Sequence, residues 1–226
     1  RQAHQLCRVN YAYENIHFPE SPEALDIARR RLAFEELFFF AIGLKLLRSR
    51  RETVSVEPFQ PVDMAPFYNA LPFTLTDAQR RCVEEAIADM QSGKPMNRLC
   101  QGDVGSGKTM VATACVYFCI KNGHQAALMA PTELLAEQHY RGLAPLLERL
   151  NIRCALLTGS TTVKTKRSVT AQLATGEIDF AIGTHALISG GVAYADLGLV
   201  VTDEQHRFGV AQRTALAEKG EHPHTL

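Results

Sequence analysis

The sequence lacks a long apolar segment. Its longest apolar run, LFFFAIGL at residues 37–44, is flanked by charged residues on both sides and is far shorter than the ~20 residues that cross a bilayer. No secretory signal is recognisable either, so we expect no membrane partner. The chain begins at Arg1 rather than at a methionine, and we expect it to be a piece of a longer protein.

The sequence also lacks a surplus of charge. Lysine plus arginine equals aspartate plus glutamate at 24 each, so any binding to nucleic acid must come from local patches rather than from the overall field. None of the six cysteines has the CxxC spacing of a zinc or redox site, which predicts a reducing, cytoplasmic setting. The 46% apolar content is enough for one substantial core.

One long helix is predicted from Ser21 to Glu52, because Ser21 can cap it and Pro22 suits its first position. Arginines cluster near both ends, at Arg29–Arg31 and at Arg48, Arg50 and Arg51. Two interpretations stay open. The arginines grip a nucleic-acid backbone, or the helix is a strut whose apolar middle packs on a neighbour.

Prolines at 58, 61, 66 and 72 indicate a connection rather than a helix. We place a domain boundary near residue 66, so that residues 1–66 form an N-terminal helical linker and residues 67–226 a second domain. From there the pattern alternates between short apolar strands and helices. The expected helices are 76–91, 107–121, 132–150 and one near 162–175, and the expected strands are 97–101, 125–130, 153–158, 178–184 and 197–203. This alternation predicts an α/β fold with a parallel sheet covered by helices on both faces.

The stretch GDVGSGKT follows an expected strand and precedes an expected helix, which is the context of the phosphate loop G-x-x-x-x-G-K-[ST]. Its residues are Gly102, Asp103, Val104, Gly105, Ser106, Gly107, Lys108 and Thr109. Glycines let successive N–H groups point inward around an anion, Lys108 would neutralise the β- and γ-phosphates, and Thr109 would take one Mg²⁺ position. The alternative is an ordinary glycine-rich turn.

A second metal partner is predicted where LVVTDEQH ends a strand. Asp203 can hold Mg²⁺ through water, and Glu204 can orient and polarise an attacking water. Paired acids at a strand end are common, and it is the phosphate loop about a hundred residues earlier that makes this pair a candidate catalytic site. The expected ligand is therefore ATP with Mg²⁺.

Several runs together resemble a known family. They are LPFTLTDAQ, GDVGSGKT, APTELLAEQH, LLTGS, IGTHALI and DEQHRFGVAQR, in order from Leu71 to Arg213. They are similar to the first RecA-like motor domain of superfamily-two DNA helicases and translocases, and most similar to the bacterial helicases that act on branched DNA. Transcription-repair coupling translocases share GDVG.GKT and HRFGV but lack MAPTELLAEQH in this form. A P-loop GTPase or kinase is the less favoured class, because no NKxD motif follows; a nucleotide-regulated binding module without turnover also stays open.

The resemblance implies roles for residues outside the phosphate loop. Phe73 and Gln79 would contact adenine, although Gln79 is also an ordinary polar residue for a first helical turn. His206 would couple nucleotide state to a neighbouring domain, or make a simple hydrogen bond to the acids. The implied DNA contacts are Pro131, Thr132, Gly159, Ser160, Thr184 and His185. For these residues a structural role remains open: a strand-to-helix junction, a solvated turn, or a structural histidine whose hydrogen bonds are satisfied.

The resemblance also implies partners that this sequence does not contain. In that family ATP lies between two motor domains, the second of which supplies arginine fingers, and a wedge domain recognises branched DNA. We therefore expect this chain to bind ATP·Mg²⁺, to hydrolyse it slowly and to contact DNA weakly. The longer protein is expected to be a helicase of recombination and repair in the bacterial cytoplasm.

Overall fold

The structure is a computed structural model that describes residues 6–51 and 54–226. It forms two compact units, one up to Val54 and one from Ser55 to Leu226. This division lies earlier in the chain than the boundary expected near residue 66. The reason is that the segment from residue 55 to residue 66 packs into the second unit. Val56 N–H donates to the Gly93 carbonyl at 3.0 Å, and Phe59 is only 7% exposed in the core.

The first unit contains helices α1 (Val9–His17) and α2 (Pro22–Arg51). The cap on α2 is as predicted, since Ser21 Oγ accepts the N–H of Ala24 at 3.1 Å; α1 was not predicted. Within the first arginine cluster, Arg31 pairs with Glu35 of the same helix at 3.3 Å. The end predicted at Glu52 and the side chains of Arg48, Arg50 and Arg51 lie outside the described residues. No helix in the described ranges is long and apolar enough to cross a membrane.

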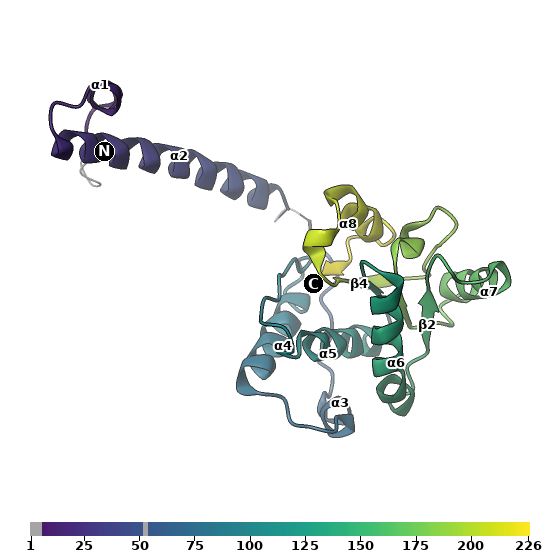
Figure 1. The fold of residues 1–226 in the computed structure, drawn as a ribbon. Coiled ribbons are helices and arrows are strands. Elements are labelled where there is room, and N and C mark those ends of the chain that lie inside the picture. Colours follow the sequence, from purple (N-terminus) through teal and green to yellow (C-terminus); the bar gives the residue numbers. More distant parts are fainter. Residues whose placement is uncertain (1–5, 52–53) are drawn as a thin grey trace. The chain divides into compact units, whose positions relative to one another are not determined.

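The described part of the second unit contains one five-stranded sheet (Figure 1). Its strands are β1 (Gln125–Met129), β2 (Cys154–Leu157), β3 (Phe180–Gly183), β4 (Leu197–Thr202) and β5 (His224–Thr225). They lie in the order β2-β3-β1-β4-β5, and each neighbouring pair is parallel. The predicted α/β class is confirmed.

Helices cover both faces of this sheet, as expected from the apolar strands. Along β1, Ala126 and Leu128 point into one core and Ala127 and Met129 into the other. The first core is closed by α4 (Asp77–Met90), α5 (Lys108–Lys121) and α6 (Glu133–Arg149), and the second by α7 (Val163–Ala174) and α8 (Val210–Ala217). The short helix α3 (Ala65–Ala70) falls where the sequence predicted a connection. Its second residue is Pro66, and proline is tolerated in a first helical turn.

The strand predicted at residues 97–101 is wrong. Only Asn97 makes an isolated bridge, to Thr225, and Arg98 N–H donates to the Thr225 carbonyl at 3.0 Å. Past Arg98 no described backbone group continues this ladder, so the segment stays irregular despite its apolar residues. The fifth strand is instead β5, which the sequence analysis did not anticipate.

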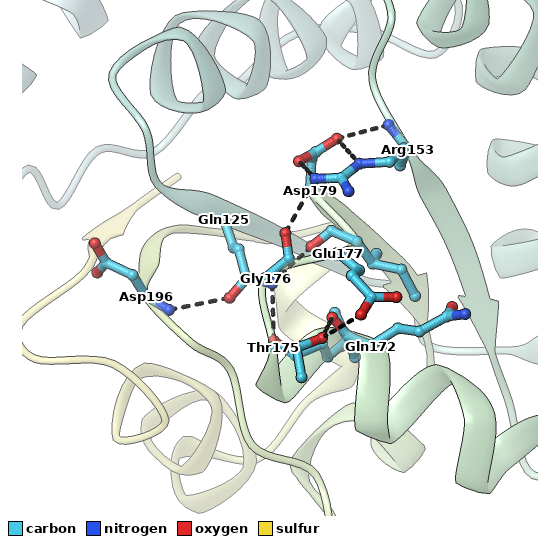
Figure 2. A network of polar contacts seen from close by, with 10 residues as sticks. Gln125, Arg153, Gln172, Thr175, Gly176, Glu177, Asp179 and Asp196 are labelled. Atoms are coloured by element: carbon cyan, nitrogen blue, oxygen red, sulfur yellow. Dashed lines mark hydrogen bonds and ion pairs between the residues drawn. The ribbon is translucent and has the colours of Figure 1, made fainter.

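Polar side chains at the amino ends of the strands bond to nearby backbone groups and, in one pair, to each other (Figure 2). Gln125 Nε2 donates to the carbonyls of Leu173 and Ile178 at 3.0 and 2.6 Å, and its Oε1 accepts the N–H of Asp196 at 3.0 Å. Arg153 Nη2 donates to Asp179 Oδ1 at 2.7 Å. These hydrogen bonds occupy the polar groups at the amino ends of the strands, which gives these groups a structural role.

The pairing around β5 predicts a pH-dependent stability. His224 is 2% exposed, and its Nδ1 accepts the Met96 N–H at 2.9 Å. Burial, with the nearby charge of His124, lowers the pKa of His224 from 6.5 to about 4. The unfolded chain therefore binds more protons below pH 6.5, so the free energy of unfolding should fall as the pH drops from 6.5 towards 4. Urea denaturation at a series of pH values measures this slope.

His224→Gln is the matched variant, because its amide oxygen can still accept the Met96 N–H without titrating. It should be less stable near neutral pH but should lose less stability between pH 6.5 and 5, where few carboxylates titrate. An unchanged slope in this variant would assign the pH dependence to other groups.

Candidate nucleotide and nucleic-acid site

The candidate residues lie at one edge of the sheet. The parallel strands all end there, and in parallel α/β sheets this carboxyl edge is where ligands bind. Pro131 follows β1, Gly159 follows β2, Thr184 follows β3 and Asp203 follows β4. Candidates far apart in the sequence thus meet at this edge.

The phosphate loop precedes α5 and presents unpaired donors. Gly105 and Gly107 both have φ of 80°, a left-handed conformation that glycine adopts without strain. A Cβ on Gly107 would collide with the Gln79 side chain. Within the described residues, nothing accepts the N–H groups of Gly105, Gly107, Lys108 or Thr109. Unpaired donors grouped around a helix start in this way are suited to bind an anion.

The Lys108 side chain lies within the same loop. Its Nζ donates to the carbonyls of Gly102 and Asp103, at 2.7 and 2.8 Å. A Cβ on Gly102 would lie 2.8 Å from Ser106 Oγ, so the loop leaves little room for larger side chains. One ammonium and several amide donors therefore share a small loop, which matches the charge and size of a polyphosphate.

Gln79 links α4 to the phosphate loop. Thr76 caps α4 and accepts the Gln79 N–H at 3.3 Å, while Gln79 Oε1 accepts the Thr76 N–H at 2.9 Å. Gln79 Nε2 then donates to the Ser106 carbonyl at 2.8 Å. The amide retains one hydrogen and one lone pair, which leaves capacity to meet a base edge. Gln79 thus has a structural role in the loop and still has hydrogen-bonding capacity for a nucleotide base.

Two other predicted nucleotide contacts are accessible. Phe73 is half exposed, and its ring can stack on a base. Val104 is fully exposed in the phosphate loop.

Asp203 directly follows β4, and its backbone and its carboxylate both make hydrogen bonds; the carboxylate's partners include the Glu204 backbone, which also lowers the pKa of Asp203. Its N–H donates to the Met129 carbonyl at 3.0 Å, and its Oδ2 lies 2.8 Å from His139 Nε2. The hydrogen bond with His139 lowers the pKa of Asp203 below its usual value, against partial burial, and the charge of Lys108 acts in the same direction. Asp203 is therefore ionised at neutral pH and lies within electrostatic range of the phosphate-loop lysine.

Glu204 has an unusual backbone. Its φ of 51° and ψ of 48° are left-handed, which is uncommon for a residue other than glycine and concentrates at functional sites. His206 Nε2 lies 3.5 Å from Glu204 Oε2, and the two side chains are 70% and 45% exposed. The contact is loose, so His206 is free to meet another partner.

Thr132 and Ser160, two of the predicted DNA contacts, are linked through Glu133, the residue that follows Thr132. Thr132 caps α6 and accepts the Leu135 N–H at 3.3 Å. The next residue, Glu133, accepts the Ser160 N–H through its Oε1 at 3.0 Å. Gly159 and Ser160 are exposed, but the Ser160 amide is engaged by Glu133 rather than open to a phosphate.

The candidates after β3 differ from each other. His185 is exposed, whereas Thr184 is 2% exposed. The Thr184 hydroxyl has no hydrogen-bond partner among the described residues. The expected contact from the Thr184 side chain to DNA therefore has no support in this structure, and the neighbouring His185 presents the accessible group.

The residues expected to hold Mg²⁺ fit it only together with a nucleotide. Thr109 is partly exposed in the first turn of α5, and Asp203 is partly exposed. Across residues 6–51 and 54–226 no cluster of three or more His, Cys, Asp or Glu side chains could enclose a metal ion. Mg²⁺ usually takes one or two protein ligands and completes its shell with substrate phosphates and water, which suits this pair.

The sequence analysis missed His139 and Glu133. His139 lies three residues after Ala136 and four before Leu143, both of which are buried, so it stands on the apolar stripe of α6. A polar residue on such a stripe needs a partner, and that signal could have singled out His139. An acid in a first helical turn is ordinary, so Glu133 carried no comparable signal.

The phosphate loop before α5 and the acid pair after β4, on a parallel sheet covered on both faces, define a RecA-like P-loop helicase domain. The profile of the DEAD/DEAH box helicase family matches residues 76–223. This chain belongs to that family.

The chain is also similar to bacterial proteins named ATP-dependent DNA helicase RecG. That of Synechocystis sp. is 47% identical over all of this chain and 28% of the relative. That of Bacillus subtilis is 46% identical over all of this chain and 34% of the relative. That of Thermotoga maritima is 46% identical over 98% of this chain and 29% of the relative. The chain thus spans about a third of the length of these relatives.

Solved structures agree with this assignment. A RecG bound to a three-way DNA junction covers all of this chain, with 43% identity and a TM-score of 0.86; the match spans 30% of that chain. The DEAD-box helicase Mss116 bound to ssRNA and UDP-BeF covers 74% of this chain at 17% identity and a TM-score of 0.59, and the match spans 38% of that chain, which supports the fold alone. The resemblance stated from the sequence motifs is confirmed.

Gln79→Ala should destabilise the second unit. The variant removes half of the α4 capping box and the hydrogen bond to Ser106. A cap contributes ~1 kcal/mol and a hydrogen bond ~1 kcal/mol, so the free energy of unfolding should fall by about 1–2 kcal/mol. Urea denaturation measures the change. Arg80→Ala, at the exposed next position, is the control and should change stability by less than ~0.5 kcal/mol.

Proposed function

We propose that this chain is the ATP-binding motor half of an ATP-dependent DNA helicase that remodels branched DNA in recombination and repair. The observation that carries the proposal is that Asp203 lies within electrostatic range of the phosphate loop, since the charge of Lys108 contributes to lowering the pKa of Asp203. RecG relatives and the RecG structure bound to a three-way DNA junction support the choice of DNA. We assign the second unit to the first motor domain and the first unit to a helical linker.

The chain's own groups divide the work of ATP hydrolysis. The amides of Gly105, Gly107 and Lys108 bind phosphate oxygens, and the Lys108 ammonium neutralises charge on the β- and γ-phosphates. Thr109 and Asp203 would hold Mg²⁺, which would supply charge neutralisation for the phosphates when it is bound with the nucleotide. Glu204 accepts a hydrogen bond from the attacking water and orients it.

The DNA-facing groups lie on the other side of the same edge. Thr132, Gly159, Ser160 and His185 are exposed after β1, β2 and β3, whereas Asp203 follows β4. Contacts from such groups to a phosphate backbone fix position without reading sequence. A motor that acts on DNA structure rather than on base sequence requires contacts of this kind.

The partners we propose are a second motor domain and a wedge domain of the longer protein. The chain spans about a third of its RecG relatives, which leaves length in them for further domains. We propose the bacterial cytoplasm as the location. The cysteines suit a reducing setting, since all six are free and burial raises the pKa of Cys115 and Cys154 to about 12.

Titration of a fluorescent ATP analogue with Mg²⁺ into the purified chain tests the nucleotide site. We expect saturable binding that ATP and ADP reverse and that GTP reverses less well. Lys108→Ala should weaken binding by about 10-fold or more, because it removes the charge facing the phosphates.

Gln138→Ala, at an exposed position on α6, is the control and should bind the analogue as the unchanged chain does. Equal binding by Lys108→Ala and the unchanged chain would show that the phosphate loop is not the binding site.

The isolated chain should hydrolyse ATP very slowly. In the family that the sequence motifs resemble, a second motor domain is expected to supply arginine fingers, and such a finger contributes ~10³ to 10⁵ in rate. Phosphate release measured with and without branched DNA checks this. Rapid turnover that Lys108→Ala abolishes would contradict the expectation and would place the complete catalytic set on this chain.

A further inference from the structure

His139 makes a close contact with the predicted catalytic acid. Its Nε2 lies 2.8 Å from Asp203 Oδ2, and the two side chains are 14% and 31% exposed. An ionised carboxylate only accepts hydrogen bonds, so Nε2 must carry the hydrogen and donate it. The bond is therefore charge-assisted and only partly open to water, which makes it stronger than a surface contact.

The position of His139 on α6 is one that an apolar residue would ordinarily fill. Ala136, Leu143 and Leu147 on the same helix are buried, and their spacing from His139 places it on the same stripe. Burying the polar nitrogens of the His139 imidazole at this position costs free energy unless they are hydrogen-bonded. Asp203 is the hydrogen-bond partner that the structure gives it.

The bond from His139 and a hydrogen bond from the Glu204 backbone both help to direct the Asp203 carboxylate, and the His139 bond has the larger effect on its pKa. The bond from its N–H to the Met129 carbonyl fixes the backbone but leaves the side-chain torsions free. The bond to His139 fixes the position of Oδ2 against α6 and leaves Oδ1 outside that bond. A carboxylate that is already oriented loses less conformational freedom when it takes up a metal-bound water.

The same helix reaches the predicted DNA-facing loops. Glu133, in the first turn of α6, holds the Ser160 N–H at 3.0 Å, and His139 lies further along the same continuous helix. A single rigid element therefore contacts both a loop expected to meet DNA and the acid expected to meet Mg²⁺.

We propose that His139 is a positioning residue for Asp203, which orients that carboxylate for Mg²⁺ bound with ATP and ties it to helix α6. The inference rests on the proposed function, because it requires the nucleotide site. Residues that orient a metal-holding side chain are typically worth 10- to 100-fold in metal affinity. Loss of the His139 donor should therefore raise the Mg²⁺ concentration that half-saturates nucleotide binding by about 10-fold or more.

The experiment measures binding of a fluorescent ATP analogue to the purified chain as Mg²⁺ is varied, and again in EDTA. The pH is kept well above the ordinary aspartate range so that Asp203 is ionised in every variant. His139→Leu suits the apolar stripe but cannot donate, whereas His139→Gln keeps an N–H donor. Gln138→Ala is the matched control, and thermal unfolding of each variant reports folding.

We expect His139→Leu to shift the Mg²⁺ midpoint upward while its affinity in EDTA is unchanged, and His139→Gln to recover part of the shift. A midpoint in His139→Leu equal to that of the unchanged chain would overturn the inference. An equal loss with Mg²⁺ and in EDTA would also overturn it, since that is the mark of a structural role. If the unchanged chain binds no nucleotide, the proposed function itself fails and the inference with it.

Discussion

Every strand pairing that the structure describes is parallel, and this constraint decides where chemistry can occur on the chain. Parallel strands bring their carboxyl ends to one edge, so each crossover returns a new strand end to the same place. The loops after β1, β2, β3 and β4 therefore share an edge although the sequence separates them widely. At the other end of the strands, polar groups such as Gln125 and Arg153 are occupied by hydrogen bonds within the fold (Figure 2).

The order of the strands then separates the two halves of the site. β4 carries the acids and neighbours β5, whereas β2 and β3 carry loops with exposed groups. β1 lies between them, and α6 begins directly after it. Helix α6 is thus placed to contact both halves, and it does so through two side chains, since Glu133 in its first turn bonds to Ser160 and His139 further along bonds to Asp203.

The sequence predicted most of this arrangement from local rules. The phosphate loop could be predicted because its glycines and its lysine are close together in the sequence. The strand that ends in acids could be predicted for the same reason. The failures were of another kind. Residues 97–101 have a strand-like composition, but a strand exists only where a facing backbone pairs with it, and the partner here is the distant Thr225. The bond from His139 to Asp203 likewise joins residues that only the folded sheet brings together.

The pairing of Met96 with His224 has a consequence for the order of folding. The two residues are 128 positions apart, and the phosphate loop begins only a few residues after Met96. Contacts of such separation form late, because the intervening chain must first be ordered. During synthesis from the amino terminus, the loop leaves the ribosome long before the strand that anchors the segment leading into it. The nascent chain should therefore lack this anchor for the segment before the phosphate loop until β5 has been made.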